Sequence, residues 1–522
     1  MKKTKKLTTL LSILLICVLM TACGENLSGR TDSSRKLSEE DAVTELEALL
    51  TKVSVKNIEA ELDIDGDSEV NTLADELPDI NTYDMVVNGN GTIDIEIFSS
   101  TEKASDNETD RWLIDMAEKF NSSNYEINGK SVTVSIRSIA SGTATDYIVS
   151  GKYTPDAFSP SNELWGEMVK SENITLTEVS SRLAGNTAGI LLTAEAYNEL
   201  KENSGEVTLE SVVDEAIKGN LLLGYTNPYV SSAGLNVLVS MLQKFDSSDP
   251  FSDSATAKLE ELQANIPSVA YTTAQMRQTA SKGLLDAMVM EYQAYINSSD
   301  LSDYEFVPFG VRHDSPLYAV GDASEETIQG LEKFAEYCQS DDAQKAASDY
   351  GFNGTDDYQQ EDNQYSGEEL YRAQELWKEK KDAGQPVVAV FVADISGSML
   401  GTPMSELQSS LINASKYIGD NNYVGLVTYN SEVYINLEIG QFNNKQRAGF
   451  TGSVKSLSAA GGTATYDAAL VACDMLLKAK DDIPNAKLMI FVLSDGEQAD
   501  GYSYSKVEDV VYNLKNVFNS QL

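Results

Sequence analysis

Oxygen-bearing side chains follow two strongly apolar stretches in the last quarter of the chain. They are Asp394, Ser396, Ser398 and Asp495. The first three alternate directly after the stretch at 387–393, and Asp495 comes soon after the stretch at 487–493. Carboxylate and hydroxyl oxygens are the ligands that hard cations such as Mg²⁺ prefer. By itself this pattern has two interpretations, a site for a divalent cation and an ordinary Ser/Gly turn.

The elements that position these residues are predicted to form an α/β domain over 387–522. Continuous apolar runs of this kind are typical of buried parallel strands. Further strand-like and helix-like patterns occupy 404–419, 422–430, 431–439, 443–456, 465–481 and 504–519. Because the carboxyl ends of neighbouring parallel strands lie at one edge of a sheet, we expect Asp394, Thr463 and Asp495 to come together there.

The order of these features resembles the von Willebrand factor A domain. The resemblance rests on the D-x-S-x-S motif at 394–398, on GGT at 461–463 and on SDG at 494–496. It implies a Rossmann-like fold and Mg²⁺ binding by the five residues named above, with Mn²⁺ or Ca²⁺ as substitutes. It also implies that a carboxylate of a protein or cell-surface partner completes the metal's coordination, as in adhesion. The family's fold continues beyond the last predicted helix, so either the sequence ends early or the sheet edge is completed otherwise.

The first 22 residues have the pattern of a secretory signal. A lysine-rich start precedes an apolar run at 7–20, and small residues follow it. The run is shorter than the roughly 20 residues that span a bilayer. The sequence at 20–23, MTAC, resembles the lipobox of bacterial lipoproteins, which implies cleavage before Cys23 and lipidation of that residue. We therefore expect a bacterial cell-membrane protein on the extracytoplasmic face, held by its lipid anchor only.

Hydroxyl-rich segments follow several predicted strands in the middle of the chain. The residues that we consider as ligands are Ser99, Ser100, Ser141, Thr143, Ser159, Ser231 and Ser232. Strand and helix patterns alternate over 91–355, which indicates a parallel sheet with crossover helices. Ligands of such sheets bind beyond the carboxyl ends of the strands, and helix N-termini favour anions. This pattern favours a small solute, with an oxyanion as one candidate; the alternative is that these hydroxyls only cap helices.

The same region resembles the two-lobed, type II extracellular solute-binding proteins of transport systems. The resemblance rests on SST at 99–101, SIASGTATDYIVSG at 138–151, TNPYVSSAGLN at 226–236 and DAMVMEYQAYI at 286–296. It implies two α/β lobes joined by crossing strands, with a ligand cleft between them. Sugars stay open as ligands, because the chain has 25 tyrosines that could stack on them.

Two further segments are predicted to connect these parts. Residues 23–90 are interpreted as the lipidated cysteine and an acidic tether, with one amphipathic helix over 38–53. Residues 356–386 are interpreted as a linker with a helix over 368–384 that Gly384 ends.

Charge and residue content exclude several classes of function. With 81 acidic and 39 basic residues the formal charge is −42, which repels nucleic acid and anionic lipid head groups. His313 is the only histidine, so nucleophilic catalysis that needs histidine has one candidate, and no glycine-rich phosphate loop with lysine is present. We therefore expect a binding protein and not an enzyme. Cys338 and Cys473 are expected to be small buried side chains.

Two functions fit these expectations. The first is a lipid-anchored binding protein whose C-terminal domain engages a protein or surface partner through its metal, while the middle domain binds a solute. The alternative is a solute receptor of an ABC-type transport system, with the C-terminal domain as an accessory interaction module.

Overall fold

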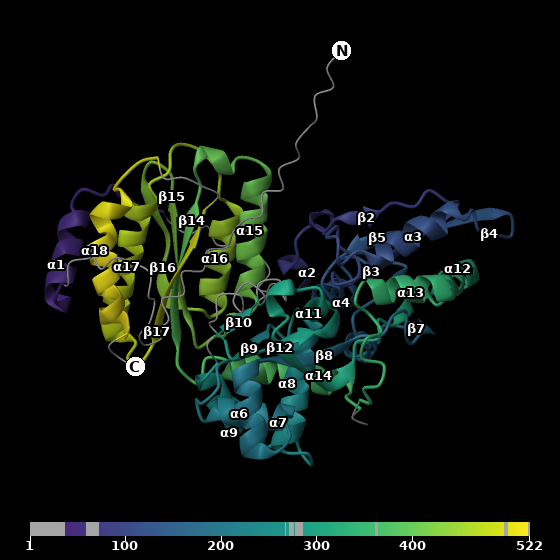
Figure 1. Cartoon of the computed structure of the whole chain (residues 1–522). Helices are drawn as coiled ribbons and strands as arrows, with labels where there is room; N and C mark the ends of the chain where they lie inside the picture. Colours follow the sequence, from purple (N-terminus) through teal and green to yellow (C-terminus); the bar gives the residue numbers. More distant parts are fainter. Residues whose placement is uncertain are drawn as a thin grey trace. The chain divides into compact units, whose positions relative to one another are not determined.

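The computed structural model describes residues 37–58, 73–266, 268–270, 276, 285–360, 364–494 and 499–519. The chain divides into two compact units (Figure 1). The larger unit is Thr72–Gly384, and the smaller unit combines the chain before it with Gln385–Leu522. No helix of the described residues is long and apolar enough to cross a membrane.

The first lobe of the larger unit has a mixed sheet with the strand order β2-β5-β3-β6-β13-β7. Its strands are β2 (Met85–Val87), β3 (Ile93–Ser99), β4 (Glu126–Ile127), β5 (Lys130–Ser138), β6 (Ala157–Ser159), β7 (Leu176–Ser180) and β13 (Leu317–Val320). Its helices are α2 (Leu73–Glu76), α3 (Trp112–Ser122), α4 (Ser141–Ser150), α5 (Leu164–Ser171), α12 (Glu325–Cys338) and α13 (Asp341–Asp349). Apolar side chains of α3 and α12 pack on one face of the sheet, and those of α4 and α5 pack on the other. The central strands β5, β3 and β6 run parallel, as the alternating pattern predicted.

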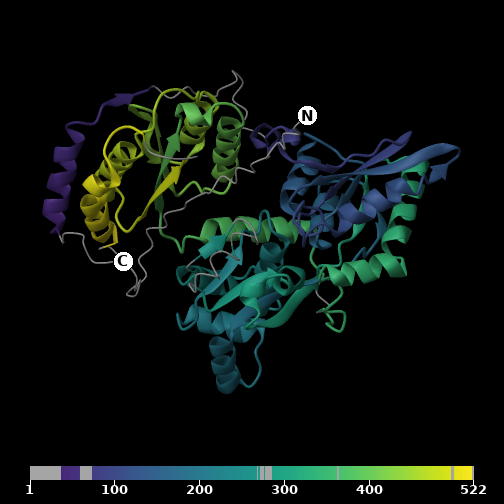
Figure 2. The ribbon, with the colours of Figure 1, turned by 45° about the horizontal axis from the view of Figure 1, so that its top comes forward.

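The second lobe has a sheet with the order β10-β9-β11-β8-β12. The strands are β8 (Thr187–Thr193), β9 (Leu223–Thr226), β10 (Ser268–Ala270), β11 (Ala287–Glu291) and β12 (Tyr304–Arg312). The helices are α6 (Ala194–Ser204), α7 (Leu209–Ile217), α8 (Ser232–Phe245), α9 (Asp253–Ala264) and α11 (Tyr292–Ile296). Two crossings join the lobes, from β7 to β8 and from β12 back to β13 (Figures 1 and 2). The predicted two-lobed α/β architecture is therefore confirmed.

The smaller unit is a three-layer α/β/α domain. Its sheet has the order β1-β16-β15-β14-β17, in which β16 is antiparallel to β15. The elements are α1 (Glu39–Leu50), β1 (Val55–Asn57), β14 (Val387–Asp394), α15 (Thr402–Ser415), β15 (Tyr423–Tyr429), β16 (Val433–Gln441), α16 (Asn444–Lys455), α17 (Thr465–Asp482), β17 (Lys487–Leu493) and α18 (Tyr504–Asn519). Helices α15 and α16 cover one face, and α17, α18 and α1 cover the other. This is the predicted Rossmann-like arrangement.

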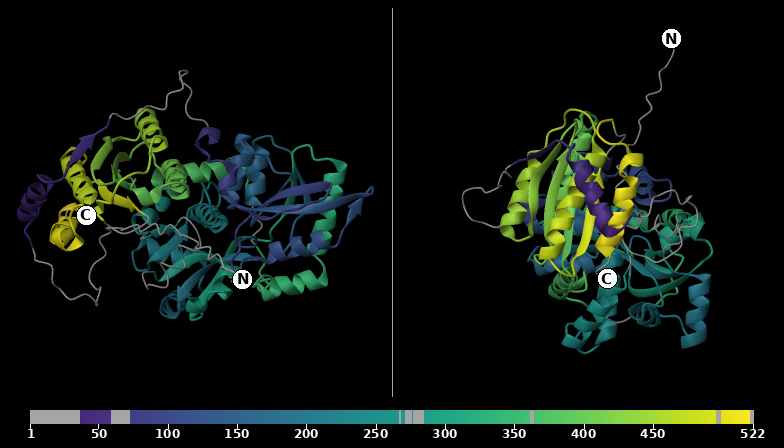
Figure 3. Two further views of the ribbon diagram at one scale, coloured as in Figure 1. Left: turned by 90° about the horizontal axis from the view of Figure 1, so that it is seen from above. Right: turned by 90° about the vertical axis from the view of Figure 1, so that its left-hand side faces the viewer.

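Residues 37–58 are part of this domain, which differs from the tether predicted over 23–90. Helix α1 buries Ala42, Leu46 and Leu49 in the core that α17 and α18 share, and it lies beside α18 in Figures 1 and 3. Strand β1 then pairs in parallel with β16 at the sheet edge. The prediction was wrong for this part because an amphipathic helix does not reveal in the sequence which distant surface it packs on.

The predicted linker over 356–386 also contains an element of a folded domain. Helix α14 (Gly367–Lys380) packs against α5 of the first lobe and against α8 and α9 of the second. Its buried Leu370, Ala373 and Trp377 join an apolar core to which both lobes contribute. Helix α14 therefore packs against both lobes and is part of the folded solute-binding domain.

Candidate functional site

The predicted metal residues begin at the end of β14. The carboxylate of Asp394, which is fully buried, accepts a hydrogen bond of 2.8 Å from the backbone N–H of Ser396. The hydroxyls of Ser396 and Ser398 lie 3.0 Å apart, and Ser398 is exposed to solvent. Asp394, Ser396 and Ser398 therefore form one group of oxygen-bearing side chains, and solvent reaches this group at Ser398.

The second predicted loop is held beside the first by backbone hydrogen bonds. The N–H of Ala460 donates to the carbonyl of Ile395 at 2.8 Å. The N–H of Gly397 donates to the carbonyl of Gly461 at 2.9 Å. Thr463 follows directly and is buried. The structure thus places the Thr463 loop against the D-x-S-x-S turn. The fifth predicted ligand, Asp495, lies outside the described residues.

Two side chains that the sequence analysis did not single out contact Asp394. Its second carboxylate oxygen accepts a hydrogen bond of 2.7 Å from the hydroxyl of Ser494 and one of 3.3 Å from that of Tyr429. Burial, reinforced by the nearby Asp394 charge, raises the pKa of Tyr429, so the phenol stays protonated and donates. Tyr429 is the residue that pairs with Asp394 in the β14–β15 register, so this contact depends on strand pairing.

This loop edge has the chemistry of a hard-cation site. Within the part of the chain that is described, no group of three or more His, Cys, Asp and Glu side chains could hold a metal ion. Asp394 and the hydroxyls of Ser396 and Ser398 are oxygen donors that the described part of this edge offers to a cation. Oxygen ligands with few carboxylates suit Mg²⁺, which retains several waters.

The hydroxyls predicted as solute ligands fall into two groups, one on each lobe, and their roles differ. Ser99 and Ser159 end the paired strands β3 and β6, and both are fully buried. Ser141 begins α4, and its hydroxyl lies 3.5 Å from that of Ser161. Thr143 is buried in the first turn of the same helix. These residues come together at the carboxyl edge of the first lobe's sheet.

On the second lobe, the two predicted serines bind protein groups. Ser231 caps α8 by accepting from the N–H of Gly234 at 3.4 Å, so the capping alternative holds for this residue. The hydroxyl of Ser232 accepts a hydrogen bond of 2.8 Å from the indole N–H of Trp165 in the first lobe. The two lobes are therefore in direct contact at this point.

The N-terminus of α4 meets protein and not open space. The N–H of Gly142 donates to the carbonyl of Val230 at 3.2 Å. A Cβ at position 142 would lie only 2.0 Å from the carbonyl oxygen of Tyr229, so the close approach of the lobes requires glycine. This backbone contact occupies the helix end that the sequence analysis considered for an anion.

A buried ion pair adjoins Ser100. The ammonium of Lys103, which is fully buried, donates to Ser100 and, at 3.0 Å, to the carbonyl of Ser159. It pairs with Glu102 at 3.4 Å. Burial lowers the pKa of Lys103; burial also acts to raise that of Glu102, but the Lys103 charge and hydroxyl hydrogen bonds bring it below its usual value. Sequence reasoning missed both residues, because a Glu-Lys pair after a strand is usually a solvated surface pair.

A second polar cluster surrounds His313, the only histidine of the sequence. The side chain is fully buried, and its Nε2 lies 3.1 Å from the amide nitrogens of both Asn162 and Asn236. Its Nδ1 lies 3.6 Å from a carboxylate oxygen of Glu291. The cluster joins the first lobe, the second lobe and the crossing between β12 and β13.

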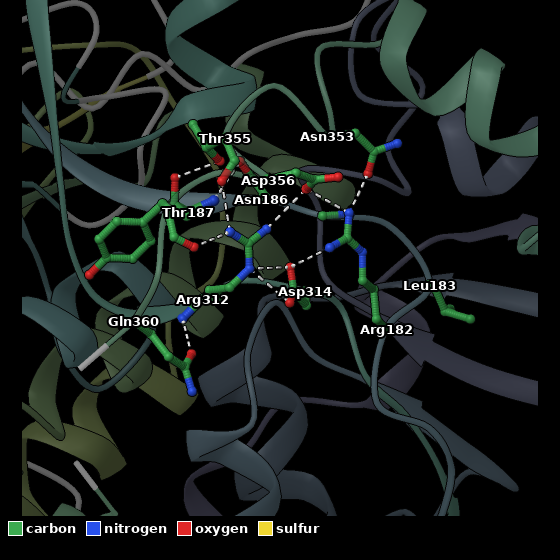
Figure 4. Close-up of polar contacts among 12 residues, drawn as sticks. Arg182, Leu183, Asn186, Thr187, Arg312, Asp314, Asn353, Thr355, Asp356 and Gln360 are labelled. Carbon is green, nitrogen blue, oxygen red and sulfur yellow. Dashed lines mark hydrogen bonds and ion pairs between the residues drawn. The ribbon is translucent and has the colours of Figure 1, made fainter. Parts of the chain in front are cut away.

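The crossings themselves are tied together by a network of charges (Figure 4). Arg312 contacts Asp314 at 2.9 Å and Asp356 at 3.2 Å, and Arg182 contacts Asp356 at 2.7 Å. Arg312 also donates to the carbonyl of Thr355 at 2.7 Å. The segment that follows α13 thus connects both crossings.

Comparisons with known proteins support both resemblances. A family model of bacterial extracellular solute-binding proteins matches residues 104–353, and one of the von Willebrand factor type A domain matches residues 389–519. None of the curated proteins compared matches the chain.

Similar solved structures include a periplasmic thiamin binding protein, at 12% identity over 58% of this chain and 100% of that chain, with a TM-score of 0.42. Iron-bound HitA from Pseudomonas aeruginosa matches at 14% identity over 56% and 99%, with a TM-score of 0.39. AfuA from Actinobacillus pleuropneumoniae, with exogenous fructose-6-phosphate bound, matches at 13% identity over 55% and 98%, with a TM-score of 0.41. The chain thus combines a bacterial extracellular solute-binding domain with a von Willebrand factor type A domain.

Proposed function

We propose that this protein is a lipid-anchored extracytoplasmic binding protein. Its von Willebrand factor type A domain binds Mg²⁺ and, through the metal, an acidic group of a protein or cell-surface partner. Its middle domain binds a small solute. The observation that carries the metal proposal is the gathering of Asp394, Ser396 and Ser398 beside the Thr463 loop at one edge of the sheet.

The reasoning for the metal follows from burial and charge. A fully buried carboxylate is stable only where hydrogen bonds or a cation compensate for its lost hydration. Asp394 receives hydrogen bonds on both of its oxygens, and neighbouring hydroxyls can supply further metal ligands. Two protein carboxylates, Asp394 and Asp495, would leave room in the coordination shell for an acidic side chain of a partner. Mn²⁺ or Ca²⁺ could take the place of Mg²⁺.

Titration of the full chain with Mg²⁺ by calorimetry tests this proposal. Asp394→Asn keeps the shape of the side chain and removes its charge, so we expect affinity for Mg²⁺ to fall by about tenfold or more. Asp482→Asn is the matched control, because Asp482 is exposed at the end of α17, and it should bind like the wild type. Equal affinity of the wild type and Asp394→Asn, with unchanged circular dichroism, would remove the metal proposal.

The anchor is tested separately. Cys23 lies outside the described residues, and its lipidation is supported by the sequence pattern alone. We expect Cys23→Ser to move the protein from the membrane fraction of expressing bacteria to the soluble fraction. Recovery of this variant with the membranes would contradict a lipid anchor at that position.

A receptor of an ABC-type transport system is the second candidate. The solute-binding domain and the buried polar groups between its lobes favour it. In that role the von Willebrand factor type A domain would be an accessory interaction module. Neither matched domain is of a catalytic type, so we propose no enzymatic activity.

A further inference from the structure

The hydrogen bonds around His313 determine where its proton lies. The amide of Asn236 is fixed in orientation, because its oxygen accepts from the N–H of Val311 at 3.1 Å and its nitrogen donates to the carbonyl of Val311 at 2.8 Å. The second amide hydrogen of Asn236 therefore points to Nε2 of His313, 3.1 Å away. Nε2 must accept this bond, so the neutral imidazole carries its proton on Nδ1.

The ring nitrogen of His313 in turn orients Asn162. Its amide nitrogen also faces Nε2 of His313, at 3.1 Å, and a flipped amide would place two acceptors against each other. Its oxygen Oδ1 is thus directed away from the ring. This oxygen is buried and has no hydrogen-bond partner among the described residues.

A second buried acceptor lies on the other lobe. The amide nitrogen of Gln293 donates to the carbonyl of Thr109 at 2.8 Å and to Asp110 at 3.2 Å, which fixes the amide. Its oxygen Oε1 has no partner among the described residues, and the side chain is fully buried. The backbone N–H of Gln293 donates to the side-chain oxygen of Asn186, and the backbone carbonyl of Asn186 accepts from the N–H of His313 at 2.9 Å. Hydrogen bonds through Asn186 therefore connect Gln293 with His313 and Asn162.

The remaining groups without a partner are a ring nitrogen and a hydroxyl. Nδ1 of His313 has no hydrogen bond in the described part of the chain, although it faces a carboxylate oxygen of Glu291 at 3.6 Å. The hydroxyl of Ser315, two residues further along the crossing, also has none. A buried polar group without a partner destabilises the folded protein, so such a concentration of them indicates a place that another molecule fills.

We propose that the interlobe network binds a neutral polyhydroxylated solute. A hydroxyl group both donates and accepts, so it can bond to Asn162 and Gln293 as a donor and to His313 as an acceptor. An oxyanion only accepts, and it would lie near the carboxylate of Glu291, 3.6 Å from His313. An ammonium ion only donates, so it cannot accept a hydrogen bond from the N–H of His313. The inference rests on the proposed solute-binding function and names its ligand class.

Thermal unfolding of the full chain with added solutes tests the ligand class. The panel contains D-glucose, D-ribose and myo-inositol as polyols, sulfate and molybdate as oxyanions, and putrescine as an amine. A ligand that binds only the folded state raises the melting temperature. We expect at least one polyol to do so and the other compounds to leave it unchanged.

The site is tested with Asn162→Val, which removes the free acceptor while Asn236 still bonds to His313. We expect affinity for the polyol to fall by about tenfold, measured by calorimetry. The exposed Asn220 supplies the control Asn220→Val, which should bind like the wild type. A polyol that binds wild type and Asn162→Val equally would overturn the assignment of this site.

The remaining outcomes separate this inference from the proposed function. A shift with sulfate, molybdate or putrescine, and none with a polyol, overturns the polyol inference and leaves solute binding intact. No shift with any compound of the panel overturns the inference and speaks against solute binding as well.

Discussion

The hydroxyl of Tyr502, near the end of the chain, donates a hydrogen bond of 3.1 Å to the backbone carbonyl of Leu49 near its beginning. A second such bond joins the N–H of Leu37 to the side-chain oxygen of Asn513 at 3.1 Å. These contacts fix α1 beside α18. The von Willebrand factor type A domain therefore includes residues that precede the solute-binding domain in the sequence.

Removing part of the α1 contact should destabilise the C-terminal domain. Leu46 is almost fully buried in the core that α1 shares with α17 and α18. We expect Leu46→Ala to lower the free energy of unfolding of this domain by about 2–4 kcal/mol, because it leaves a cavity. Urea denaturation of the full chain measures the effect. Glu47→Ala, on the exposed face of α1, should change the free energy of unfolding little. Similar effects of the two substitutions would show that the apolar face of α1 does not stabilise the domain.

The charge network at the crossings should require arginine. Arg312 bonds to Asp314, Asp356 and the carbonyl of Thr355 at once. Arg312→Lys keeps the charge but cannot reach all three, so we expect the solute-binding domain to lose about 1–3 kcal/mol of stability.

Arg111→Lys provides the comparison for the arginine prediction. Arg111 forms an ion pair with Asp115 and is about one-third exposed, so its replacement should cost less than about 0.5 kcal/mol. Urea midpoints of the two variants measure the difference. If Arg111→Lys destabilises the domain as much as Arg312→Lys, the bridging contacts are not what stabilises the crossings.

The stability of the C-terminal domain should depend on the titration of Asp467. Burial raises the pKa of this half-buried carboxyl above its usual 3.8, although the N–H of Tyr502 bonds to it at 2.8 Å. Below pH 3.8 the group is protonated in both folded and unfolded states, and its effect on stability is absent there. As the pH rises through the folded pKa, the folded state must hold a partly buried charge, and stability falls.

Asp467→Asn removes this cost and keeps an acceptor for Tyr502. We expect the variant to be more stable than the wild type by about 0.5–1 kcal/mol at neutral pH, with the solvent exposure of the group limiting the gain. The advantage should disappear as the pH falls toward 3.8. Denaturant midpoints across this range, measured with EDTA present, provide the test, and a variant that is less stable at neutral pH would contradict it.

The loops of the candidate metal site could be predicted because their signals are local. An apolar run that ends in Asp394 shows both the strand and the oxygen donors within residues 387–398. The contact from Tyr429 could not be predicted, because it depends on the register of β15 against β14. The position of α1 depends on still more distant contacts, so its amphipathic pattern indicated a helix but not its partner.

The proposed solute site was predicted less completely for a related physical reason. Serines at strand ends are visible in the sequence, but whether they face a ligand or bond to protein depends on how the lobes close. Ser231 and Ser232 bond to protein groups. The buried His313, Asn162 and Gln293 come from three separate segments, and no pattern within any one segment marks them as polar groups of a common site.

The pairing of Leu37 with Asn513 spans 476 residues, with the whole solute-binding domain between them. During synthesis, α1 can pack on α18 only after nearly all of the chain has been made. The core of the C-terminal domain can be completed only then. The solute-binding domain is connected to the C-terminal domain by two chain segments. A single proteolytic cut in either segment would divide the chain into two pieces, and only the noncovalent contacts within the C-terminal domain would hold these pieces together.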